Sequence, residues 1–95
     1  MSGTEPTAEN DSTAPTFKVL LLNDDETPME FVVGVLETVF EKPRDDAIKT
    51  MLKTHHDGTG VCGVYGAEQA DSLVKRVMAE ARRFQHPLQC VMERN

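Results

Sequence analysis

A short acidic turn between two apolar segments constrains this chain more than any other feature. The apolar run over residues 20–22 stops at the turn of residues 23–26, after which apolar residues return at helical spacing. Thr27 suits an N-cap, Pro28 suits the first helical position because it has no N–H, and Glu30 completes a capping box. The sequence therefore predicts a strand-to-helix junction whose acceptor side chains lie beside a helix N-terminus. Such a turn favours a partner that is cationic or rich in N–H donors.

Hydrophobic periodicity divides the chain into three strands and three helices. These cover residues 17–22, 28–40, 43–57, 61–65, 67–84 and 88–93, in the order β-α-α-β-α-β. Because both faces of the first strand are largely apolar, we expect it to be central in its sheet. The predicted fold class is α+β, a small three-stranded antiparallel sheet packed against three helices.

Three glycines carry further structural signals. Gly58 is expected to end the second helix in the left-handed conformation, and Gly63 indicates a bulge or a close backbone approach in the second strand. Gly34 lies inside the first helix, where Gly costs about 1 kcal/mol relative to Ala. Periodicity leaves open whether close packing or an exposed face explains Gly34.

Composition predicts one domain preceded by an arm. Residues 1–16 are rich in polar side chains and almost devoid of apolar ones, so we expect a disordered arm there and a core domain over residues 17–95. No apolar run approaches the ~20 residues of a membrane span, and the N-terminus lacks the basic and apolar regions of a signal peptide. We therefore expect a cytoplasmic protein with no membrane partner.

The charge balance bears on the kind of partner. Ten Lys and Arg against sixteen Asp and Glu give a net charge of -6, which repels phosphate backbones. We expect no nucleic-acid partner, and instead proteins or cationic groups.

Catalytic chemistry has weak support in these residues. The carboxylates of the acidic turn with His55 could hold a metal or transfer protons, and Cys62 could act as a nucleophile beside a histidine. Adjacent loop carboxylates are more often turn formers, and Cys62 and Cys90 have neither a CxxC pair nor zinc-ligand spacing. We expect no enzyme activity, no cofactor and no metal, and we interpret both cysteines as small buried hydrophobes rather than a disulfide.

Ligand recognition needs fewer assumptions than catalysis. The acidic turn, His55 on the apolar stripe of the second helix, and the adaptable side chains Met29 and Met51 together fit a pocket with a charged rim and an apolar interior. Periodicity alone favours the simpler alternative, in which both methionines fill the core.

Four separated segments resemble the bacterial ClpS family, the adaptors of the Clp protease. They are NDDETPMEFV (23–32), MLKTHHDG (51–58), GVCGVY (60–65) and HPLQC (86–90) with its following ME, in the family's order and spacing. The resemblance covers nearly all of the chain from Phe17 to Arg94. It implies a non-enzymatic adaptor that binds proteins through a bulky hydrophobic N-terminal residue (Phe, Tyr, Trp or Leu), the N-degron. It further implies delivery to the AAA+ unfoldase ClpA of the ClpAP protease, with help from the N-terminal arm.

The resemblance also implies site residues. Those expected at the substrate's free α-amino group are Asn23, Asp24, Asp25, Thr27 and His55. Those expected around the first side chain are Met29, Val32, Met51, Thr54 and Leu88, with Met29 as a gate against β-branched residues. Glu68 matches a family contact to the unfoldase. An ammonium offers three donors and a charge, so carboxylate and carbonyl acceptors bind it better than an internal peptide N–H.

Three positions depart from the family pattern. Thr54 stands where an apolar residue such as Val is common, Glu26 where Tyr is frequent, and Leu73 where Lys often contacts the unfoldase. We expect a monomer. The alternative hypothesis is a protein-interaction domain of similar fold with another ligand, such as the C-terminal domain of the ribosomal stalk protein.

Overall fold

The central strand β1 (Thr16–Leu22) pairs with a strand on each side. The computed structural model describes residues 14–95, and within them the sheet has the order β2-β1-β3 with both pairs antiparallel. The elements follow one another as β1, α1 (Met29–Thr38), α2 (Arg44–Asp57), β2 (Thr59–Gly66), α3 (Ala67–Arg83) and β3 (Gln89–Arg94). The predicted fold class, element order and central first strand are confirmed.

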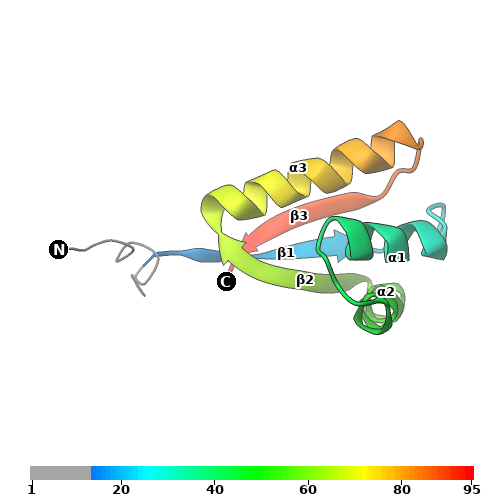
Figure 1. Cartoon of the computed structure of the whole chain (residues 1–95), viewed down its shortest axis with the longest axis horizontal. Helices are drawn as coiled ribbons and strands as arrows, with labels where there is room; N and C mark the ends of the chain where they lie inside the picture. The colour runs from blue at the N-terminus through cyan, green and yellow to red at the C-terminus, as the bar shows by residue number, and fades with distance from the viewer. Residues whose placement is uncertain (1–13) are drawn as a thin grey trace.

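The three helices pack against different parts of the sheet. Helix α3 runs along the sheet and contacts all three strands, while α1 and α2 lie at the end where β1 stops (Figure 1). Core side chains that are almost fully buried come from β1, from the three helices and from the segment before β3: Val19, Leu21, Val33, Val35, Leu36, Ala47, Ala70, Val77, Ala81 and Leu88. Cys62 and Cys90 are buried free thiols, as predicted.

Strand β2 contains the irregularity that Gly63 indicated. Val19 pairs with Gly63 but the next residue, Leu20, pairs with Val61, so Cys62 is an extra residue in the ladder. A Cβ on Gly63 would also overlap the ring of Tyr65. The bulge and the close approach are both present, and together they explain a glycine inside a strand.

The capping box predicted at the start of α1 is wrong. Pro28, in extended conformation, is the N-cap, and its carbonyl accepts from the N–H of Val32 at 3.2 Å. The Thr27 hydroxyl donates to the Asp24 carboxylate at 2.6 Å, and no side-chain hydrogen bond caps the start of α1. Glu30 reaches across to Arg44 of α2.

The end of α1 and the start of α2 also differ from the predicted boundaries. Helix α1 ends at Thr38 rather than residue 40, because the chain reverses at Glu41 with a φ of 56° and the Lys42 N–H returns to the Leu36 carbonyl. Pro43 is the N-cap of α2 and not its first helical residue. The predicted end of α2 is confirmed, since Gly58 is a left-handed C-cap with a φ of 90°.

Most of the arm predicted over residues 1–16 lies outside the described residues, which begin at residue 14. Of the remaining three, Thr16 is already the first residue of β1.

Candidate functional site

A cavity of about 210 Å³ opens where β1 ends, next to the start of α1 and the end of α2. Its walls are Leu22, Asn23, Asp24, Asp25, Thr27, Pro28, Met29, Val32, Met51, Thr54, His55 and Leu88. All ten residues predicted for the amino-group site and the side-chain pocket are therefore brought together around one cavity.

The rim of the cavity is a turn rich in oxygen acceptors. The amide nitrogen of Asn23 donates to Asp25 Oδ1 at 3.2 Å, which leaves the Asn23 amide oxygen as an acceptor. Thr27 is buried, and its hydroxyl and N–H both donate back to Asp24, at 2.6 Å and 3.2 Å. The Thr27 hydroxyl and one N–H of the Asn23 amide thus donate within the turn, whose carboxylates give the rim acceptor oxygens and negative charge.

A backbone hydrogen bond fastens this turn to the second helix. The Asn23 N–H donates to the carbonyl of Gly58, the C-cap of α2, at 2.8 Å. His55 lies one turn before Gly58, and its exposed side chain lines the cavity. The left-handed cap therefore holds His55 beside the acidic turn although the two are distant in the sequence. Neighbouring His56 pairs instead with Asp57, outside the cavity.

The interior of the cavity is apolar and closed at its base. Leu88, Val32 and Met51 are all buried, whereas Met29, the first residue of α1, is 46% exposed at the mouth. The unbranched, polarizable side chain of Met29 can adapt its shape at this position.

Thr54 is a buried polar residue in this apolar base, and its hydroxyl is bonded within its own helix. Its hydroxyl donates to the Thr50 carbonyl at 2.8 Å inside α2, and a Cβ built on Gly60 of β2 would overlap it. The hydroxyl proton of Thr54 is thus used inside α2, so it is not free to bond a ligand in the cavity. The departure from the family's apolar residue therefore changes the cavity less than the sequence suggests.

Features of an enzyme site are not found around this cavity. Across residues 14–95 no group of three or more His, Cys, Asp and Glu side chains could hold a metal ion. Burial raises the pKa of the Cys62 thiol to about 12, with Cys90 nearby adding to the effect, and Cys62 does not line the cavity. A thiol that stays protonated at neutral pH is a poor nucleophile. In the same part of the chain no helix is long and apolar enough to cross a membrane.

Two residues that line the cavity were not predicted from the sequence, and the residue predicted to contact the unfoldase lies outside the cavity. Leu22 and Pro28 also line the cavity, and their positions at either end of the acidic turn were the available signal. Glu68 is exposed in the first turn of α3 and is not part of the cavity.

Comparison with known proteins identifies the family. A family model described as "ATP-dependent Clp protease adaptor protein ClpS" matches residues 12–91. The chain belongs to the ClpS family. Members of this family are adaptors of the Clp protease, and the chain is accordingly an adaptor rather than a protease.

Individual relatives agree with this family assignment. The ATP-dependent Clp protease adapter protein ClpS of Nitrosospira multiformis is 60% identical over 81 residues, covering 85% of this chain and 79% of its own. That of Caulobacter vibrioides is 58% identical over 79 residues, covering 83% and 72%. Among solved structures, Agrobacterium tumefaciens ClpS2 bound to L-phenylalaninamide matches with a TM-score of 0.83 and 33% identity, covering 85% of this chain and 98% of its own.

Proposed function

We propose that this ClpS-family chain binds proteins whose first residue is Phe, Tyr, Trp or Leu and delivers them to a ClpA-type AAA+ unfoldase for degradation by ClpAP. The observation that carries the proposal is the combination, in one cavity, of an acceptor-rich rim and a closed apolar base. An N-terminal residue is the one part of a protein that presents an ammonium group and a side chain on the same carbon atom.

The rim suits an ammonium group. Asn23, Asp25 and His55 would accept its three N–H donors, while Asp24, held by Thr27, adds negative charge. Hydrogen bonds to a charged group contribute about 1.5–3 kcal/mol each, more than those to a neutral amide. His55 must accept through an unprotonated ring nitrogen, so its protonation would oppose binding.

The apolar base suits a bulky side chain that is not branched at Cβ. Burial of a large apolar side chain contributes about 1.5–3 kcal/mol, which a cavity lined by Val32, Met51 and Leu88 can supply. Met29 at the mouth would contact the Cβ of the guest and so disfavour Ile and Val.

The structural neighbour supports the same ligand class. L-Phenylalaninamide, to which the Agrobacterium protein is bound, has a free α-amino group, an aromatic side chain and an amide in place of a second residue. It carries every feature that the proposed site would recognise.

Delivery is proposed to use surfaces outside the cavity. Glu68 is exposed at the start of α3, where it can contact the unfoldase while the cavity is filled. Residues 1–16 are proposed as a flexible arm that assists delivery, and the protein is proposed to act as a cytoplasmic monomer.

A reconstituted degradation assay tests this function. Purified ClpA and ClpP should degrade a fluorescent protein that begins with Phe faster when this chain is added, and the same reporter beginning with Ile should be unaffected. Equal acceleration of both reporters, or of neither, would contradict the proposal.

A further inference from the structure

A second cavity lies between α1 and α3, on the flank of α1 away from the candidate site. It measures about 240 Å³ and is lined by Glu30, Phe31, Gly34, Val35, Thr38, Glu80 and Phe84. It shares no residue with the first cavity. We refer to these seven residues as the α1–α3 groove.

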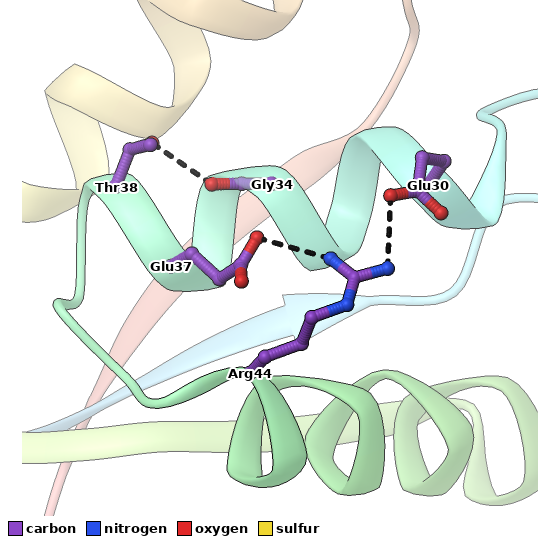
Figure 2. Close-up of polar contacts among 5 residues, drawn as sticks. All are labelled: Glu30, Gly34, Glu37, Thr38 and Arg44. Atoms are coloured by element: carbon purple, nitrogen blue, oxygen red, sulfur yellow. Dashed lines mark hydrogen bonds and ion pairs between the residues drawn. The ribbon is translucent and has the colours of Figure 1, made fainter.

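Gly34 creates open space in this groove at a cost to the helix. Gly is among the least favourable residues in a helix interior, and a Cβ built on Gly34 would meet no atom within 4 Å. Thr38 donates to the Gly34 carbonyl at 2.9 Å on the side of α1 away from Arg44 (Figure 2). Among residues 14–95 neither packing nor backbone conformation requires a glycine at residue 34, so the space it leaves is available to a guest.

Phe84 gives the groove an aromatic wall. It follows directly after the last residue of α3, and its side chain is 50% exposed, which is unusual for a large aromatic residue. Its ring meets that of Phe31 edge-on, with centroids 5.9 Å apart. An exposed ring supported by a second ring offers a firm apolar surface to a ligand.

The ionisable residues of the groove are carboxylates on opposite walls. Glu30 projects from α1 and Glu80 from α3. Arg44 holds Glu30 from the α2 side at 3.2 Å (Figure 2), and Arg83 is 3.9 Å from Glu80 with its guanidinium 5.3 Å from the Phe84 ring centroid. The chain's own Arg83 thus already shows the chemistry that this surface attracts, a cation next to an aromatic face and a carboxylate.

We propose that the α1–α3 groove binds a segment of a partner protein in which an aromatic or large aliphatic side chain is flanked by Lys or Arg. The apolar side chain fills the space above Gly34 beside Phe84, and the cations face Glu30 and Glu80. Residues 1–13 do not have the composition proposed for this segment, because they contain Glu5, Glu9 and Asp11 and no Lys or Arg. The proposal is independent of the N-terminal-residue site.

Blocked peptides test this binding by NMR on the full ¹⁵N-labelled chain. The peptide acetyl-Lys-Phe-Lys-amide is excluded from the N-terminal-residue site by its acetyl group. Its addition should shift the amide signals of Gly34, Thr38 and Phe84 saturably, and acetyl-Glu-Phe-Glu-amide should bind about ten-fold more weakly or less. Equal binding of the two peptides, or shifts confined to other residues, would overturn the proposal.

Substitution of Gly34 separates a binding role from a structural one. Gly34→Ala adds a methyl group to the open space, so it should raise the melting temperature and weaken acetyl-Lys-Phe-Lys-amide binding about ten-fold or more. Leu52→Ala, an exposed change on α2 outside the groove, is the control and should leave binding unchanged. Undiminished binding by a Gly34→Ala variant that folds would also overturn the proposal.

Discussion

The Thr54 hydroxyl occupies the space that a side chain on Gly60 would need, so the helix residue at the base of the candidate site and the strand residue beside it constrain each other. Thr54 Cβ and the Thr50 carbonyl oxygen would lie only 3.1 Å and 3.3 Å from a Cβ at residue 60. A glycine outside the cavity thereby fixes the position of a side chain that lines it.

Gly60→Ala should therefore act on both stability and selectivity. The added methyl group pushes Thr54 toward the cavity, which should cost about 1–3 kcal/mol of unfolding free energy and reduce the room for a guest. Under the proposed function, peptides that begin with Trp or Phe should lose more affinity than peptides that begin with Leu. Denaturant unfolding and peptide titration measure the two effects.

A double-mutant cycle checks the cause. Because Thr54→Ala removes the overlapping hydroxyl, Gly60→Ala should cost less in the Thr54→Ala background than alone, with a coupling of about 1 kcal/mol. Additive costs would show that the contact between these two residues does not matter.

Asp25 and Glu26 are adjacent carboxylates with different positions relative to the cavity. Asp25 lines the cavity and Glu26 does not. Asp25→Asn should weaken the binding of a peptide that begins with Phe about ten-fold. This is the lower end of the range for losing a hydrogen bond to a charged group, because Asp25 is exposed. Glu26→Gln removes the same charge from the same turn and should change affinity by less than about two-fold, as expected for a screened surface charge. Similar losses for both variants would assign the effect to general charge instead of to the rim.

Met29 is proposed to exclude β-branched residues. Met29→Ala removes the side chain from the mouth of the cavity, so peptides beginning with Ile or Val should bind where they did not before. Leu52→Ala, a truncation of another exposed apolar side chain on α2, is the matched control. An unchanged preference in Met29→Ala would mean that another residue forms the gate.

The two cysteines give a prediction about pH and reactivity. Burial raises the pKa of both the Cys62 and the Cys90 thiols from 9.0 to about 12. The unfolded chain ionises at the lower value, so unfolding free energy should fall as pH rises from about 9 toward 12. At pH 8 both thiols should react with an alkylating reagent only at the rate of unfolding, and mass spectrometry of the native protein follows this. Rapid native labelling would contradict the burial.

Much of the fold could be predicted because local signals agree with the tertiary structure. The left-handed cap at Gly58 and the bulge beside Gly63 both follow from residue types that tolerate special backbone geometry. The capping box failed because the helix begins one residue later than predicted, with Pro28 as its N-cap, and the residue types at 27 and 28 suit either boundary.

The candidate site likewise has a part that could be predicted from the sequence and a part that could not. The residue types alone suggested a pocket formed by the acidic turn, His55, Met29 and Met51, and the family resemblance added Val32, Thr54 and Leu88. The contact between Thr54 and Gly60 could not be predicted because it joins two elements through space. Gly34 illustrates the limit most clearly. The sequence left packing and exposure equally open, and only the relation of α1 to α3 reveals empty space at that residue.

Fluorescence anisotropy with two forms of one peptide tests the central claim most directly. A labelled peptide that begins with Phe should bind the chain saturably, and its N-acetylated form should bind at least about a hundred-fold more weakly because acetylation removes the ammonium that the rim would accept. Equal affinity of the free and acetylated peptides would contradict the account.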